Sequence, residues 1–260
     1  MNIEQTAKHF DLTGKVILVT GGTRGLGLAM ARAFAQAGAD LVVSSRKPEA
    51  CAAVASEITS ELGARCTGVA CHVGDWDACD ALVEAAYAEY GRVDVLVNNA
   101  GMSPLYSSLS SVSRELFDKV LGVNLAGPFR LSAVVGERMA AGEGGSIINI
   151  SSTAAAMPTA SEIPYGAAKA GLQNLTTGLA HSFGPRVRCN CIMPGPFLTE
   201  ISKAWDMEAM EKMFEQMIPL QRAGQAGEIV GAALYLASDA SSYTNGAIIK
   251  VDGGMSYAAS

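Results

Sequence analysis

The feature that most constrains the fold is a glycine-rich turn at residues 20–27, which reads Thr-Gly-Gly-Thr-Arg-Gly-Leu-Gly. The apolar run before it, residues 15–19, is typical of a buried parallel strand. The alanine-rich segment after it, residues 26–35, has the apolar spacing of a helix packed on a sheet. Such a turn lets backbone approach a ligand closely, and the helix N-terminus offers free N–H groups to an anion. We therefore predict a pyrophosphate site, with a glycine turn that binds nothing as the alternative.

Length and composition indicate one α/β domain over residues 1–260, because 260 residues with 49% hydrophobic side chains can bury a large core. The formal net charge of −6 and the scattered arginines argue against a nucleic-acid partner. Short apolar runs and a polar N-terminus predict a soluble, cytoplasmic protein that does not associate with membranes. The six cysteines include no Cys-x-x-Cys pair, which favours buried reduced thiols, and no cluster has metal-ligand spacing.

After residue 13, segments typical of strands and helices alternate. Strands are expected at residues 15–19, 40–45, 65–73, 93–98, 146–151, 187–193 and 247–251, and helices at 26–35, 48–62, 75–90, 164–183, 199–217 and 227–237. A further helical region, residues 113–141, has a possible bend near Gly122 and Gly127. This alternation predicts a Rossmann-type, doubly wound parallel sheet of about seven strands with helices on both faces.

Polar and turn-forming residues follow four of the predicted strands, at residues 20–21, 98–101, 151–152 and 194–195. Ligands on such sheets bind beyond the carboxyl ends of the strands, so these residues are expected to meet at one edge. The alternative is that they only form turns, for which Gly, Asn, Ser and Pro are common for local backbone reasons.

Tyr165 and Lys169 are four residues apart, so on a helix both side chains project from one face. A phenol with an ordinary pKa near 10 is a poor base at neutral pH, and a nearby ammonium favours the phenolate. Ser152 lies at the end of a predicted strand, where its hydroxyl could bind a substrate oxygen. The alternatives are a Tyr and a Lys that share a solvated face, and a Ser that caps a turn.

Taken together, these motifs resemble those of the short-chain dehydrogenase/reductase family, and the chain as a whole is similar to the 3-oxoacyl-carrier-protein reductase-like members of that family. The resemblance spans residues 12–254 and rests on the turn at 20–27, Asn-Asn-Ala-Gly at 98–101, Asn124, Ser152, the Tyr165/Lys169 pair, Pro194-Gly195 with Thr199, and Val-Asp-Gly-Gly at 251–254. The resemblance implies an enzyme that interconverts a ketone and a secondary alcohol with a nicotinamide cofactor. A regulator that binds the dinucleotide without catalysis is the alternative, although such proteins usually lose part of the Tyr-x-x-x-Lys set.

The resemblance also implies a catalytic tetrad of Asn124, Ser152, Tyr165 and Lys169. In it, Tyr165 exchanges a proton with the substrate oxygen, and Ser152 holds that oxygen. Lys169 lowers the Tyr165 pKa and binds the nicotinamide ribose hydroxyls, and Asn124 supports a water relay. The cofactor contacts implied in the same way are Gly21, Thr23, Arg24, Gly25, Leu26, Gly27, Ser45, Arg46, His72, Val73, Asn99, Ala100, Gly101, Tyr165, Lys169, Pro194, Gly195, Phe197 and Thr199.

One position departs from the family pattern, because His72 stands where many members carry an Asp that contacts the adenine amine. His72 either contacts adenine through its ring or is a packed residue that binds nothing.

The end of the second strand predicts the choice of cofactor. NAD-binding chains normally place an acid there for the adenosine 2′-hydroxyl, but this chain has the neutral Ser45 followed by Arg46. Together with Arg24 in the turn, Arg46 could bind a 2′-phosphate, so NADP(H) is expected to be preferred over NAD(H). The alternative is that both arginines are solvated surface charges.

Residues 196–222 correspond to the variable substrate lid of the family. They carry Phe197, Leu198, Ile201, Trp205, Met207, Met210, Met213, Phe214 and Met217, which suggests an apolar or partly apolar small-molecule substrate. The alternative is that most of these side chains only pack the lid on the core. Small residues in the helix from Pro164 onward, namely Gly166, Ala167, Ala168, Ala170 and Gly171, predict a homotetramer or dimer that pairs through this helix.

Overall fold

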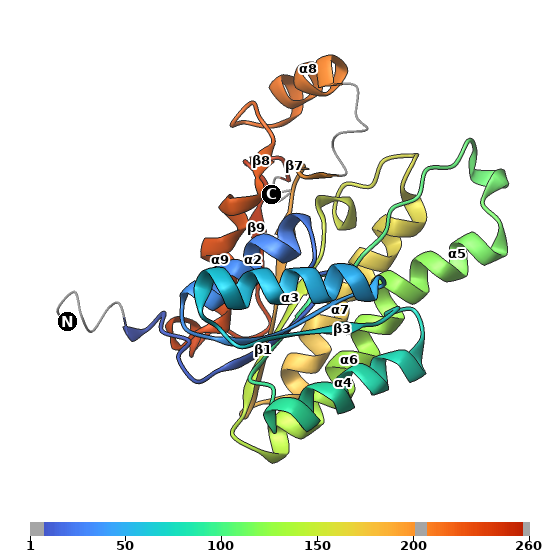
Figure 1. Ribbon diagram of the computed structural model, residues 1–260. Coiled ribbons are helices and arrows are strands. Elements are labelled where there is room, and N and C mark those ends of the chain that lie inside the picture. The colour runs from blue at the N-terminus through green and yellow to red at the C-terminus, as the bar shows by residue number, and fades with distance from the viewer. Residues whose placement is uncertain (1–7, 201–206, 257–260) are drawn as a thin grey trace.

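The computed structural model describes residues 8–200 and 207–256, and its centre is a seven-stranded parallel sheet (Figure 1). The strand order is β3-β2-β1-β4-β5-β6-β9. The strands are β1 (Val16–Thr20), β2 (Asp40–Ser45), β3 (Cys66–Ala70), β4 (Val95–Asn98), β5 (Gly145–Ile150), β6 (Val187–Pro194) and β9 (Ile248–Val251). Order and direction confirm the predicted doubly wound Rossmann-type sheet.

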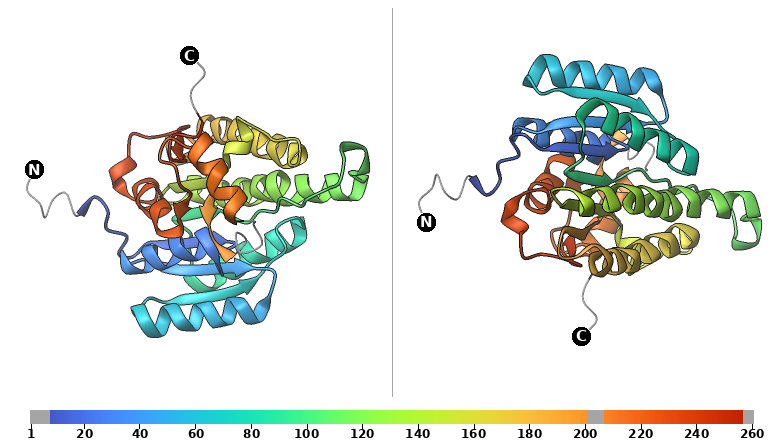
Figure 2. Two further views of the ribbon diagram at one scale, coloured as in Figure 1. Left: turned by 90° about the horizontal axis from the view of Figure 1, so that it is seen from above. Right: turned by 90° about the horizontal axis from the view of Figure 1, so that it is seen from below.

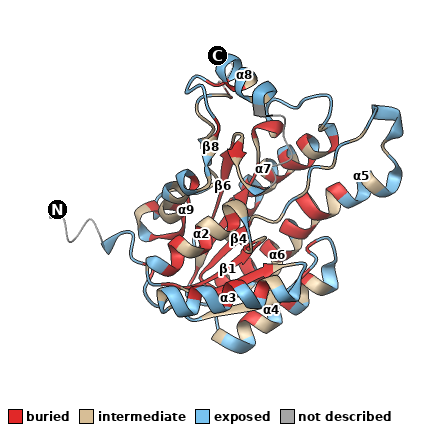
Figure 3. Cartoon of the chain, turned by 45° about the horizontal axis from the view of Figure 1, so that its top comes forward, coloured by how far each residue is buried: buried red, intermediate tan, exposed pale blue. Residues whose placement is uncertain are grey.

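Helices cover both faces of the sheet, as the views in Figure 2 show. On one face α2 (Gly25–Gln36) packs against α3 (Pro48–Leu62) and α9 (Val230–Ala237), and on the other α6 (Gly127–Ala141) packs against α4 (Trp76–Tyr90) and α7 (Ile163–Phe183). Strand β1 contributes side chains to the core on both faces of the sheet: Ile17 and Val19 lie on the α2 side, and Leu18 lies on the α6 side. Burial on both faces explains the continuous apolar run that the sequence shows there. Figure 3 shows buried residues concentrated in the central strands.

The predicted bend at Gly122 and Gly127 is a π-helical turn, η2 (Gly122–Ala126), which joins α5 (Arg114–Leu121) to α6 without a break in the helix. Gly127 allows α6 to approach the loop after β3, since a Cβ there would lie 2.0 Å from the Val73 carbonyl oxygen. Strand β3 itself ends at Ala70, earlier than the predicted residue 73, so His72 and Val73 belong to that loop.

The segment expected to form the lid, residues 196–222, differs from the single helix predicted over residues 199–217. Its parts are β7 (Phe197–Leu198), which pairs with β8 (Gly224–Gln225), and the helix α8 (Met207–Met217). Helix α8 stands clear of the sandwich at the top of Figure 1. Phe214 is buried in a small hydrophobic cluster, and Met210 and Met213 pack against it, whereas Met217 is exposed. Three of these four side chains therefore serve to pack this segment. Ile201 and Trp205 lie outside the described residues.

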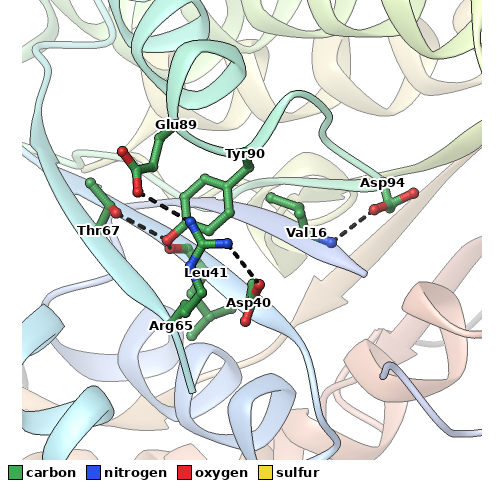
Figure 4. A network of polar contacts seen from close by, with 8 residues as sticks. All are labelled: Val16, Asp40, Leu41, Arg65, Thr67, Glu89, Tyr90 and Asp94. Carbon is green, nitrogen blue, oxygen red and sulfur yellow. Dashed lines mark hydrogen bonds and ion pairs between the residues drawn. The ribbon is translucent and has the colours of Figure 1, made fainter. Parts of the chain in front are cut away.

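Polar contacts brace the amino ends of the strands, opposite to the edge where the site is expected (Figure 4). The hydroxyl of Tyr90, at the end of α4, lies 3.0 Å from Thr67 Oγ1 in β3 and donates to the Leu41 carbonyl of β2 at 3.0 Å. The Asp94 carboxylate, just before β4, accepts a hydrogen bond of 2.8 Å from the Val16 N–H of β1. Four strands are thereby held in register.

Five of the six cysteines are buried and Cys66 is half-buried. No helix among residues 8–200 and 207–256 combines the length and the hydropathy needed to cross a bilayer.

Candidate active site

The glycine turn is folded tightly against the loop that follows β4. Gly21 has a φ of +64°, which favours glycine, and a Cβ there would lie 2.8 Å from Asn99 Nδ2. Gly27 brings α2 close to the turn, because a Cβ there would lie 2.2 Å from the Gly21 carbonyl oxygen. The Asn99 amide donates to the carbonyls of Thr20 and Gly21 at 3.0 and 3.1 Å. Its side chain therefore holds the turn, a structural use that the sequence did not reveal.

Thr20 completes this join from the end of β1. Its Oγ1 accepts hydrogen bonds from the N–H groups of Asn99 and Ala100, both at 3.1 Å, and donates to the Val97 carbonyl at 3.2 Å. Hydrogen bonds thus join the start of the glycine turn to the loop after β4, which is about eighty residues away in sequence.

Replacing Gly27 by Ala is expected to destabilise the protein by about 1–3 kcal/mol, because the new methyl group meets backbone that cannot move aside. Denaturant unfolding measures the loss. Gly178→Ala in α7 is the matched control: its Cβ meets no atom within 4 Å, and the change should stabilise the helix by about 0.5–1 kcal/mol. Equal stabilities of the Gly27 variant and the wild type would contradict the close approach.

The start of α2 fits a pyrophosphate. Its N-cap residue, Arg24, makes no side-chain capping bond, so the N–H groups of the first turn are left for an anion. The first residues of the lid lie over this point, because a Cβ at Gly25 would lie 3.4 Å from Thr199 Cγ2. The first turn of α2 has the backbone donors that a dinucleotide phosphate requires.

At the end of β2, Ser45 is half-buried and its Oγ lies 3.2 Å from Cys51 Sγ. Arg24, before α2, and Arg46, after β2, are both exposed. This chain has a serine at position 45, where NAD-binding chains normally carry an acid. His72 is exposed and Val73 is buried, so His72 is not a packed core residue.

Asn124, in the π-helical turn, is fully buried and holds the loop after residue 101. Its Nδ2 donates to the carbonyls of Met102 and Val120 at 2.8 and 2.9 Å, and its Oδ1 accepts from the Met102 N–H at 3.2 Å. A Cβ at Gly101 would lie 2.9 Å from Asn124 Oδ1 and 3.6 Å from Lys169 Nζ. Asn124 and Lys169 therefore flank Gly101.

Helix α7 presents Tyr165 and Lys169 on one side, with Lys169 Nζ 5.7 Å from the centroid of the Tyr165 ring. Lys169 is buried and donates to the Ile150 carbonyl at 2.8 Å, which anchors it to the end of β5. Ser152, two residues after β5, hydrogen-bonds with Tyr165 and also accepts from the Ala154 N–H at 3.2 Å. The structure thus brings Ser152, Tyr165 and Lys169 together.

The pKa of Tyr165 is raised, not lowered as the resemblance implied. Burial is the main cause and the Glu162 carboxylate adds to it, while the hydrogen bond with Ser152 acts in the opposite direction. Burial also lowers the pKa of Lys169 to about 8, because the same environment disfavours the ammonium. Desolvation therefore dominates the pKa of the phenol, and Lys169 is not among the groups that shift it.

Of the other predicted contacts, Thr23 lies in the glycine turn and Leu26 in α2, whereas Pro194 and Gly195 lie at the carboxyl end of β6. The Gly195 N–H donates to the Val251 carbonyl at 3.0 Å, which fixes Pro194 and Gly195 beside β9. Phe197 is buried in β7, where its ring lies beside Gly224 and packs in the core layer that contains Ile17 and Val19. Sequence reasoning missed Tyr106 and Glu162, which lie beside Tyr165. No local pattern marks them. No group of three or more His, Cys, Asp or Glu side chains within the described ranges could hold a metal ion.

Known proteins share this arrangement. Residues 21–256 match the family model described as enoyl-(acyl carrier protein) reductase. D-threitol dehydrogenase of Mycolicibacterium smegmatis is 39% identical over 247 residues, covering 94% of each chain. The chain belongs to the short-chain dehydrogenase/reductase family. L-rhamnose 1-dehydrogenase (NAD(P)(+)) of Azotobacter vinelandii is 38% identical over 251 residues, 94% of this chain and 97% of that protein.

Among solved structures, the gluconate 5-dehydrogenase from Burkholderia cenocepacia J2315 in complex with NADP and tartrate superposes with a TM-score of 0.91. It is 33% identical, and the match covers 96% of this chain and 98% of that one. This short-chain dehydrogenase/reductase is therefore an NAD(P)-dependent oxidoreductase that interconverts alcohols and ketones and acts on a small molecule.

Proposed function

We propose that the protein interconverts a secondary alcohol and a ketone with NADP(H), and that Tyr165 is the acid and base of the reaction. The observation that carries this proposal is the meeting of Tyr165, Ser152 and Lys169 at the carboxyl end of β5. A phenol that hydrogen-bonds with a serine, beside a buried ammonium, has the groups needed to hold and protonate an oxygen that develops charge.

Each residue has a defined task in this scheme. During reduction the Tyr165 hydroxyl gives its proton to the substrate oxygen and becomes a phenolate, and during oxidation that phenolate takes the proton of the substrate hydroxyl. Ser152 donates to the same oxygen and orients it. The nicotinamide, when bound, exchanges a hydride with the carbinol carbon.

Lys169 and Asn124 support this centre. Lys169 has three N–H donors, of which the Ile150 carbonyl takes one, and the others are suited to ribose hydroxyls. The three hydrogen bonds of the Asn124 side-chain amide are made with main-chain groups of Met102 and Val120. We propose that Asn124 supports a water relay by fixing this backbone beside Gly101, which it flanks together with Lys169.

The preference for NADP(H) is supported by the neutral Ser45 and by the exposed Arg24 and Arg46. A guanidinium can bind a 2′-phosphate through two parallel charge-assisted hydrogen bonds. The absence of an acid at position 45 removes the repulsion that would reject that phosphate.

A panel of secondary alcohols and ketones, followed by nicotinamide absorbance with both cofactors, tests the function directly. We expect turnover of at least one alcohol and ketone pair, faster with NADP(H). Tight binding of dinucleotide with no turnover across a broad panel would instead favour a regulator that binds the cofactor without catalysis.

We also propose that the protein forms a homodimer or homotetramer through α7. Ala167 and Ala170 are exposed, whereas Gly166 and Ala168 are buried against the rest of the chain, so only part of the predicted small-residue set is free for a partner helix. Light scattering should give a dimer or tetramer mass, and Ala170→Arg should shift it towards the monomer because the added side chain blocks close approach. A monomer mass for the wild type would contradict this assembly.

A further inference from the structure

A hollow beside Tyr165 has not been used by the mechanism so far. It lies between the loop after residue 101, helix α5 and the start of α7, and two prolines and two aliphatic side chains form much of its wall. The ring of Tyr106 and the side chain of Glu162 complete it. Because Tyr165 lines the same hollow, a substrate whose oxygen is bound at the Tyr165 hydroxyl would reach into it with its neighbouring carbons.

The segment that carries Glu162 is held in place by Tyr106. The Tyr106 hydroxyl donates to the Ala160 carbonyl at 2.8 Å and accepts from the Ile163 N–H at 3.0 Å. These two residues stand on either side of Glu162 in the sequence. The position of the Glu162 side chain is thereby set by a contact from a loop more than fifty residues away.

Glu162 is the charged residue of this hollow. Its Oε1 accepts from Thr159 Oγ1 at 3.1 Å and, more weakly, from the Thr159 N–H at 3.4 Å. Its Oε2 takes part in none of the hydrogen bonds and ion pairs found among residues 8–200 and 207–256, so it can still accept one. Glu162 and Tyr165 line the same hollow, and the carboxylate helps to raise the pKa of Tyr165.

We propose that Glu162 is a specificity-determining residue, which accepts a hydrogen bond from a hydroxyl next to the reacting carbon of a neutral polyhydroxy substrate and excludes an anionic group there. This inference rests on the proposed role of Tyr165. In a largely apolar wall, a carboxylate binds a hydroxyl donor favourably, but a second carboxylate meets a like charge with no cation in the wall to offset it. Neutral polyols and sugars are therefore the substrate class that this site fits.

The test compares matched pairs of secondary alcohols that differ only in a CH2OH or a carboxylate group next to the reacting carbon, such as 1,2-propanediol with lactate and threitol with threonate. For the wild type, kcat/KM should be at least about tenfold higher for the neutral member, as expected for like charges in a half-exposed site. Glu162→Gln should reduce that ratio about tenfold, mainly through a lower KM for the acid. The glutamine keeps the acceptor for Thr159, so folding should not change.

Glu137→Gln, which removes an exposed carboxylate from α6, is the matched control and should leave the ratio unchanged. A wild type that prefers the acids, or an unchanged ratio in Glu162→Gln, would overturn the assignment of Glu162 while leaving the proposed function intact. Lack of turnover of every pair by the wild type would count against the proposed function, and against the role of Glu162 with it.

Discussion

Tyr165→Phe should lower kcat/KM by roughly 10²–10⁴-fold, the usual contribution of general acid–base catalysis, while NADPH binds almost as well as to the wild type. Only the hydroxyl proposed to exchange the proton is deleted, and the ring keeps its place beside Lys169. Steady-state kinetics with the best alcohol from the panel and fluorescence titration of NADPH measure the two quantities separately.

Tyr243→Phe is the control for this substitution, because the Tyr243 side chain is fully exposed and should tolerate the change with no effect on the rate. A Tyr165→Phe enzyme with a near-native rate would refute the role assigned to Tyr165. A parallel loss of NADPH affinity would show instead that the substitution disturbs the whole site.

The wild type should bind NADPH about tenfold to a hundredfold more tightly than NADH, because one charge-assisted contact to the 2′-phosphate contributes about 1.5–3 kcal/mol. Ser45→Asp combined with Arg46→Ile should abolish or reverse the preference, since an acid then faces the phosphate and a guanidinium is gone. Titration of both reduced cofactors into both proteins provides the four dissociation constants needed.

Ser110→Asp combined with Lys119→Ile is a matched control that changes the net charge equally at exposed positions elsewhere. It should keep the preference for NADPH, which separates a local contact from the general field of the protein. If the wild type binds NADH as tightly as NADPH, then Arg24 and Arg46 do not recognise the phosphate.

Local patterns in the sequence determined the fold and much of the site. Strand β1 is buried on both faces, so its apolar run was visible without coordinates. The four-residue spacing of Tyr165 and Lys169 places them on one side of any helix, and the structure has them there. Polar residues after the strands were expected at one edge because parallel strands share that edge, and Thr20 does bond the loop of Asn99.

Only the tertiary structure decided which groups surround these residues and how they are charged. The partners of Asn99 and Tyr106, and the Met102 partner of Asn124, lie between 22 and 79 residues away, at separations that no local period encodes. The same holds for the raised pKa of Tyr165, because desolvation depends on what is packed over the phenol and not on the residue four positions later. Spacing along the chain determines which side chains share a helix face, whereas burial and long-range contacts determine what those side chains can do.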